Sequence, residues 1–392
     1  MANSKPARIL ALDAFRGVTI LVMIFVNTLA GVHGMPAWME HAPADADAMT
    51  FPDVVFPAFL FIVGMSIPFA MAQRQAAGDT AAARWRHVLT RAAGLLVLGV
   101  FMVNAEDGYN EAAMGMSIHL WSLLFYGCAM LVWAVHRFEN RMLSMALRVA
   151  GACGLVALAL AFRGGADGNL RLAPQWWGIL GLIGWAYLYS AAAWEIARAR
   201  ILPLIALVLA CTGLYVATHA AGAQPPALLR LLGAQAENAV HASIALCGMV
   251  TSLVFFGQGR GKPFRDALLL ALALTAIAFV LRPWFKISKI YATPSWALYS
   301  SAICVLLFSA LYWVVDLRRI SGWVALVRPA AANPLLVYII PYIAYALMQL
   351  LHLALPDVLG SGWPGFLWAL AYAIIVMALA AVLNRLHFKL QL

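Results

Sequence analysis

Residues 51–73 read FPDVVFPAFLFIVGMSIPFAMAQ, a stretch whose one charged residue, Asp53, stands near its start. A helix needs about 20 mostly apolar residues to cross the hydrocarbon core of a membrane. Backbone groups in hydrocarbon must pair internally, which leaves only helices or a closed barrel. Barrel strands alternate apolar and polar residues. This stretch is continuously apolar, so it predicts a transmembrane helix.

The same pattern runs through the whole chain. Of its 392 residues, 64% are hydrophobic and 11% are charged, whereas soluble domains have about 25% charged residues. We therefore expect an all-α, polytopic integral membrane protein with one transmembrane domain over residues 1–392. About 12 transmembrane helices are expected, within a range of about 10 to 12. The predicted spans are 12–33, 51–73, 85–104, 117–135, 143–162, 176–196, 201–219, 239–257, 264–285, 295–316, 332–352 and 361–384.

The distribution of lysine and arginine predicts the orientation. With the N-terminus in the cytoplasm, the inside segments hold 20 of these residues and the outside segments hold 6. Cytoplasmic loops carry an excess of lysine and arginine, so both termini are predicted to be cytoplasmic. We expect a multi-pass protein of a bacterial inner membrane, with membrane lipid as a partner. The net charge of +10 then reflects topology, and no nucleic-acid partner is expected.

The five cysteines all fall inside apolar runs, and none belongs to a CxxC pair. No metal site and no disulfide framework are therefore expected. The oligomeric state stays open, with a homodimer among the options.

Residues 8–68 hold the most informative polar groups. Asp13 and Arg16 are three residues apart and share a helix face. Asn27 follows eleven residues later, which places it about 16 Å further along a helix. His41 lies in the next loop, before Asp53. Imidazole is the usual general base near neutral pH. The alternatives are a solvated histidine and an aspartate that only caps the second helix.

This region resembles the transmembrane family of heparan-alpha-glucosaminide N-acetyltransferase. Its overall pattern is most similar to that of the bacterial members associated with amino-sugar use. The resemblance covers a catalytic-motif block at residues 8–104 and a second block at residues 282–345. The first block includes Asp13 to Gly17, Phe-Val-Asn27, the His41 loop and Asp53 to Gly64. The second includes Thr293-Pro-Ser-Trp296, Tyr312-Trp-Val-Val-Asp316 and Asn333-Pro-Leu-Leu-Val-Tyr338.

The resemblance implies a reaction and a set of residue roles. Enzymes of that family take acetyl from cytoplasmic acetyl-CoA and place it on the amine of a glucosamine across the membrane. His41 matches the essential histidine, and Asn27 and Asp53 match polar residues around the reacting centre. Arg16 matches the arginine at the cytoplasmic mouth. His41 would act as a nucleophile or as a base, Asn27 would donate to the oxyanion, and Asp53 would hold the other imidazole nitrogen.

Three further residues are assigned to binding of the CoA donor. Asp13 would pair with Arg16, and Lys286 and Lys289 would bind an anionic group. The acceptor is expected to be a small sugar or glycan.

Two other functions stay open. An inner-membrane transporter for a sugar or amino sugar fits the number of spans, with Pro68, Gly94 and Gly99 as candidate helix breaks. A non-catalytic membrane partner explains the spans but leaves Asp13, Arg16, Asn27 and His41 without a role. The role of residues 139–281 is not predicted.

Overall fold

The computed structural model describes residues 9–220, 226–257 and 261–392, and the elements of regular structure within these ranges are all helices. Ten of the described helices are long and apolar enough to cross a membrane, and a bent helix pair would make an eleventh span. The predicted all-α membrane fold is thereby confirmed in its coarse form. The count of twelve and the side of each terminus stay predictions, and the N-terminal residues 1–8 lie outside the described ranges.

The ten helices that are long and apolar enough to cross a membrane have the following bounds. They are α1 (Leu10–Leu29), η2 with α2 (Phe51–Val54 and Val55–Ala76), α3 (Ala81–Glu106), α6 (Arg141–Ala161), α7 (Gly178–Ala197), α8 (Ile201–Ala220), α10 (Ala236–Phe256), α11 (Pro263–Leu281), α12 with η3 (Pro294–Tyr312 and Trp313–Leu317) and α15 (Gly362–Arg385). The other helices are η1 (Ala37–Met39), α4 (Glu111–Met114), α5 (Ile118–Trp133), α9 (Ala227–Gly233), α13 (Val324–Ala332), α14 (Pro334–Leu350) and η4 (Asp357–Gly360).

Two predicted spans differ from simple straight helices. The span predicted at 117–135 is the 16-residue helix α5, shorter than the other spans. The span predicted at 332–352 belongs to the pair α13 and α14, which meet at an angle of 87°. Asn333 stands at the break with φ −148° and ψ 61°. A residue before proline is disfavoured in the α region, so Pro334 ends α13 and begins α14.

Close packing of helix backbones holds the centre of the bundle. In α10, 83% of the apolar window is buried, so this helix lies at the core. A Cβ on Gly64 of α2 would overlap the Ala245 carbonyl, and one on Gly248 of α10 would overlap the Phe61 carbonyl. Small residues let helix backbones approach closely in membranes. The two glycines therefore fix the position of α2 against α10.

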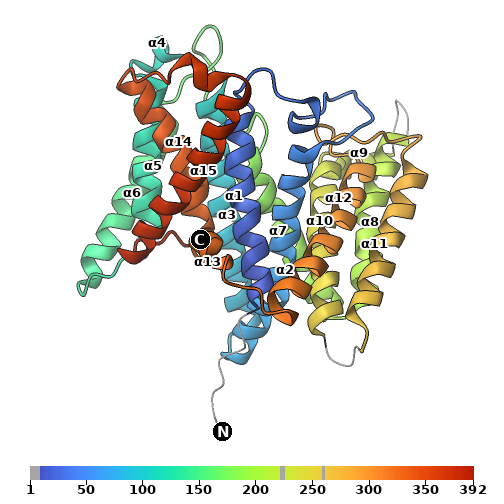
Figure 1. The fold of residues 1–392 in the computed structure, drawn as a ribbon. Helices are drawn as coiled ribbons and strands as arrows, with labels where there is room; N and C mark the ends of the chain where they lie inside the picture. The colour runs from blue at the N-terminus through green and yellow to red at the C-terminus, as the bar shows by residue number, and fades with distance from the viewer. Residues whose placement is uncertain (1–8, 221–225, 258–260) are drawn as a thin grey trace.

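The bundle has two ends, seen in Figure 1. We call the end with the first turn of α1 the lower end and the opposite end the upper end. At the upper end, His33 pairs with Ser361 through the backbone, and Ala134 after α5 pairs with Leu390 near the C-terminus, which Figure 1 shows about midway along the bundle. The long loop between α1 and α2 crosses the upper end (Figure 1). This loop carries His41, so the fold separates His41 from Arg16 by the length of α1.

Candidate active site

His41 and Asp53 meet at the upper end. The Nδ1 atom of His41 lies 2.7 Å from Oδ1 of Asp53. The Asp53 side chain is 2% exposed and that of His41 is 38% exposed. This geometry leaves Nε2 of the imidazole as the nitrogen that does not face the carboxylate. The predicted pairing of Asp53 with one nitrogen of His41 is therefore seen in the structure.

The loop before α2 holds Asp53 in place by local hydrogen bonds. Oδ2 of Asp53 accepts from the backbone N–H of Ala42 and of Thr50, both at 3.1 Å, and from the Thr50 hydroxyl at 2.9 Å. Thr50 and Asp53 form a capping box at the start of η2, a motif that satisfies free N–H groups at a helix start. Asp53 thus caps η2 and also bonds to His41, so it does more than cap the helix.

Lys289, on the loop between α11 and α12, reaches the same pair. Its Nζ lies 3.2 Å from Nδ1 and 3.5 Å from Nε2 of His41, and 3.8 Å from Oδ1 of Asp53. Burial lowers the pKa of the Lys289 ammonium, while the Asp53 carboxylate acts in the opposite direction. Lys289 therefore belongs to the His41 site at the upper end.

Contacts between two loops hold Lys289 beside His41. Asp47 accepts from the backbone N–H of Ile287 and from Nε of Arg282, both at 2.9 Å. The hydroxyl of Ser288 donates to the Ala44 carbonyl at 2.7 Å. These contacts join the His41 loop to the 282–293 loop. The hydrogen bond with Ile287, together with Arg282, lowers the pKa of Asp47, although burial acts against it.

Trp296 supports the site from below. Its indole N–H donates to the Asp53 carbonyl at 3.1 Å. The ring of His241 packs edge-on against Trp296 and Phe56. His241 is therefore packed beneath the His41 site.

Arg16 lies at the opposite end of α1. Its Nη2 donates to the Ser66 hydroxyl at 2.7 Å, and its Nη1 lies 3.8 Å from Oδ1 of Asp13. The predicted pairing of Asp13 with Arg16 is therefore present. Both Arg16 and Ser66 line a cavity of about 780 Å³.

This cavity opens at the lower end and is rich in positive charge. Exposed Gln73 and Ala77 mark its opening. It runs upward along α2 and α7 to Phe59, Leu180 and Tyr338. Its lining residues with acidic or basic side chains are Arg16, Arg74, Asp79, His87, Arg91 and Lys389. Ligand pockets in proteins span about 300 to 1,000 Å³, so the cavity is large enough for a substantial ligand.

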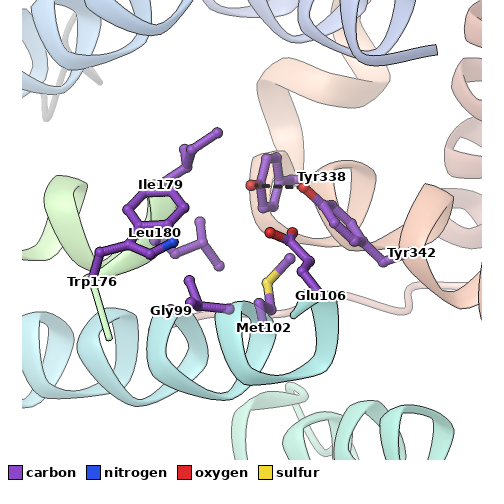
Figure 2. A pocket seen from close by; sticks show the side chains of 10 residues that line it. Gly99, Met102, Glu106, Trp176, Ile179, Leu180, Tyr338 and Tyr342 are labelled. Carbon is purple, nitrogen blue, oxygen red and sulfur yellow. Dashed lines mark hydrogen bonds between the residues drawn. The ribbon is translucent and has the colours of Figure 1, made fainter. Parts of the chain in front are cut away.

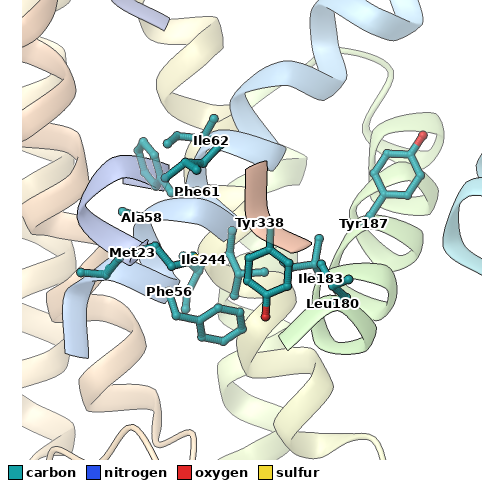
Figure 3. Close-up of a cluster of buried hydrophobic side chains, with 14 of the residues drawn as sticks. Met23, Phe56, Ala58, Phe61, Ile62, Leu180, Ile183, Tyr187, Ile244 and Tyr338 are labelled. Atoms are coloured by element: carbon teal, nitrogen blue, oxygen red, sulfur yellow. The ribbon is translucent and has the colours of Figure 1, made fainter. Parts of the chain in front are cut away.

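Buried apolar side chains close the cavity toward the upper end. Figure 3 shows Met23, Phe56, Leu180 and Tyr338 within one cluster. A second, small cavity of about 40 Å³ lies beyond it, and Leu180 and Tyr338 line both cavities. Figure 2 shows Glu106 in this small cavity beside Tyr338 and Tyr342, whose hydroxyls are 3.2 Å apart. His41 lines neither cavity.

The structure divides the predicted site residues into two groups. Asp13 and Arg16 lie at the lower end, whereas Lys286 and Lys289 lie at the upper end with His41. The four residues predicted for donor binding therefore do not form one site.

Asn27 is exposed and, within the described ranges, makes no side-chain hydrogen bond. The contact of Lys289 with His41 was not predicted, because it joins residues 248 positions apart.

Comparisons with known proteins give two kinds of relative. Heparan-alpha-glucosaminide N-acetyltransferase from Homo sapiens is 31% identical over 102 residues, which is 26% of this chain and 15% of that protein. The Mus musculus protein of the same name has the same identity and coverage. A probable potassium transport system protein, Kup 1 of Chromobacterium violaceum, is 28% identical over 182 residues, 46% of this chain and 24% of that protein.

These relatives share only part of their length with this chain, since the matches cover 15% and 24% of the curated proteins. The family comparison covers more. A family model matches residues 8–229, more than half of the 392 residues. The matched range contains α1, the His41 loop, α2 and most of the lower cavity. The chain belongs to the family described as domain of unknown function DUF5009.

Proposed function

We propose that this chain is a membrane acetyltransferase of a bacterial inner membrane. It moves acetyl from cytoplasmic acetyl-CoA to the amine of an extracytoplasmic glucosamine-type sugar. One observation carries the proposal: the His41–Asp53 pair stands at the upper end of α2, and the basic cavity runs along α2 below it. The partial match to two heparan-alpha-glucosaminide N-acetyltransferases supports the reaction class.

The lower cavity is the proposed donor site. CoA carries phosphates, and arginine pairs well with phosphate oxygens because its guanidinium offers a planar fork of donors. Arg16 and Arg91 lie along the cavity wall, and the Arg91 guanidinium stacks 4.9 Å from the ring centre of Tyr187. The upper part of the cavity is apolar and suits the thin pantetheine arm. With this orientation, the lower end is the cytoplasmic end.

The reacting centre is proposed at Nε2 of His41. Asp53 bonds to Nδ1, which leaves Nε2 for the reaction, and the His41 side chain is 38% exposed, so a sugar amine can reach the ring. Phe59, at the upper end of the cavity, is six residues beyond Asp53, which is about 9 Å along α2. In this scheme the thioester would have to pass the buried apolar cluster that includes Met23 and Phe56 to reach His41. In this scheme neither substrate crosses the membrane; only the acetyl group does.

Acetyl transfer by purified protein tests the proposal. Labelled acetyl-CoA and glucosamine should give labelled N-acetylglucosamine, and His41→Ala should lower the rate by about 10²-fold or more because the base or nucleophile is lost. His33→Ala is the matched control, because His33 is an exposed histidine of the same loop. A rate that is unchanged in His41→Ala would contradict the assignment.

A sugar carrier is the second candidate function. The lower cavity ends at Leu180 and Tyr338, and the helix pair α13 and α14 is bent by 87° beside it. Carriers often bind their substrates at such broken helices near the bilayer midplane. The partial match to a probable potassium transport protein also favours this reading. Uptake of labelled amino sugar by proteoliposomes without any acetyl donor would support the carrier.

A further inference from the structure

Lys289 lies at the His41 site, away from the lower cavity that is proposed to bind CoA. It comes from the 282–293 loop, and its ammonium lies within 3.5 Å of both imidazole nitrogens. Its side chain is 25% exposed, which places it between the buried carboxylate of Asp53 and the open side of the site. A lysine ammonium carries three donors. Only some of them are needed for His41 and Asp53, so the group can also donate to a ligand.

The distances argue against a simple ion pair between Lys289 and Asp53. The carboxylate is 2.7 Å from His41 but 3.8 Å from Lys289. Asp53 therefore orients the imidazole first, and Lys289 lies beside the ring. The ammonium is 3.5 Å from Nε2, the nitrogen left free to react. An acyl group that bonds to Nε2 would bring its carbonyl oxygen next to this ammonium.

We propose that Lys289 is a catalytic residue that donates to the oxyanion formed when His41 attacks an acyl carbonyl carbon. The proposal rests on the proposed acetyl transfer at His41. Asn27, to which the family resemblance assigns this role, is exposed and makes no side-chain hydrogen bond within the described ranges. Lys289, in contrast, is held beside Nε2 by the contacts between the two loops.

The acetyl group moves first to His41 and then to the sugar amine. The Nε2 lone pair of His41 forms a bond to the thioester carbonyl carbon, and the carbonyl electron pair moves to the oxygen, which accepts from Lys289. The oxyanion then collapses, the C–S bond breaks, and CoA leaves as a thiolate. The sugar amine attacks the acetyl-imidazole, the C–Nε2 bond breaks, and imidazole is restored. The amine loses one proton, and the thiolate gains one.

Chemical modification of His41 tests this role without acetyl transfer. Diethyl pyrocarbonate is attacked by imidazole at a carbonyl carbon, so it forms the same kind of oxyanion. The purified full chain is treated at about pH 8, where imidazole is mostly neutral, and mass spectrometry follows the peptide with His41. His352, an exposed histidine at the same end, provides the reference rate.

Loss of one oxyanion donor typically lowers a rate by about 10²–10³-fold. Lys289→Met should therefore slow modification of His41 relative to His352 by about 10²-fold. It should lower kcat for acetyl transfer by a similar factor, with KM for acetyl-CoA unchanged. Lys289→Arg should restore most of both rates because it keeps the charge and the donors. Arg230→Met, which removes an exposed cation at the same end, is the matched control.

Two outcomes separate this proposal from the proposed function. If the wild type transfers no acetyl but Lys289→Met slows His41 modification, the acetyl donor is wrong and the role of Lys289 is supported. If acetyl transfer occurs but His41 modification in Lys289→Met proceeds at the wild-type rate or faster, the oxyanion role is overturned. Lys289→Leu, which also removes the donor, replaces Lys289→Met if that variant fails to fold.

Discussion

Nδ1 of His41 and Oδ1 of Asp53 lie 2.7 Å apart, although the two residues are 12 positions apart on a long loop. The carboxylate is buried and accepts from three further donors, whereas the imidazole is partly exposed. A buried carboxylate that holds one nitrogen of an imidazole fixes its tautomer and leaves the other nitrogen to react. Asp53 is therefore expected to act through His41.

Asp53→Asn should separate orientation from folding. The amide keeps the size of the side chain but offers Nδ1 an ambiguous partner, so the reactive tautomer of His41 is no longer favoured. We expect kcat for acetyl transfer to fall by about 10²–10⁴-fold, the range of general acid–base catalysis. The measurement is steady-state transfer to glucosamine.

Thr50→Val is the control for this prediction, because it removes a hydroxyl that donates to Asp53 and leaves the carboxylate. Loss of this helix cap should lower the free energy of unfolding by about 1 kcal/mol, with kcat changed less than in Asp53→Asn. Full activity in Asp53→Asn would show that the pair with His41 is only structural.

The lowered pKa of Asp47 predicts that the contact between the His41 loop and the 282–293 loop depends on pH. Its hydrogen bond with Ile287, together with Arg282, holds its pKa below the ordinary value of 3.8. A lowered pKa in the folded state means that the contribution to stability is fully present above 3.8 and is lost as the pH falls below it. The difference in melting temperature between wild type and Asp47→Asn should therefore stay constant at higher pH and shrink only below 3.8. A difference that already shrinks near neutral pH would point to a different group.

Local patterns in the sequence predict the spanning helices and the His41–Asp53 pair. They do not predict the position of Lys289 or the size of the bend at Asn333. The spanning helices are predictable because continuous apolar runs need no knowledge of their neighbours. Asp53 beside His41 is predictable because both lie in one loop before a helix start. The place of Lys289 beside His41 is not predictable, because it depends on how the 282–293 loop packs on the His41 loop. The break at Asn333 carries a local signal in Pro334, but only the structure gives the angle of 87°.

Gly64→Ala should destabilise the bundle where α2 crosses α10. The new Cβ would overlap the Ala245 carbonyl, which is backbone and cannot rotate away. Overpacking of this kind costs about 1–3 kcal/mol. Gly127→Ala on α5 is the matched control, because its Cβ would meet nothing within 4 Å. Thermal unfolding in detergent should show a lower midpoint for Gly64→Ala than for Gly127→Ala. Equal midpoints would mean that α2 and α10 are packed less closely.

Arg16→Gln should weaken donor binding and leave the chemistry of His41 intact. Arg16 lines the lower cavity and donates to Ser66, far from the upper end. A hydrogen bond from a charged donor contributes about 1.5–3 kcal/mol, so the dissociation constant of CoA, measured by calorimetry, should rise about tenfold or more.

Two comparisons make the prediction for Arg16 specific. Arg86 is exposed near the same end but does not line the cavity, so Arg86→Gln removes the same charge away from the proposed donor site. CoA should bind this variant as it binds the wild type. Modification of His41 by diethyl pyrocarbonate should proceed at the wild-type rate in Arg16→Gln, because Arg16 is at the opposite end of α1 from His41. Equal weakening by Arg16→Gln and Arg86→Gln would mean that CoA responds only to the overall charge of the lower end. The cavity would then not be the donor site, and the carrier would become the better description of the molecule.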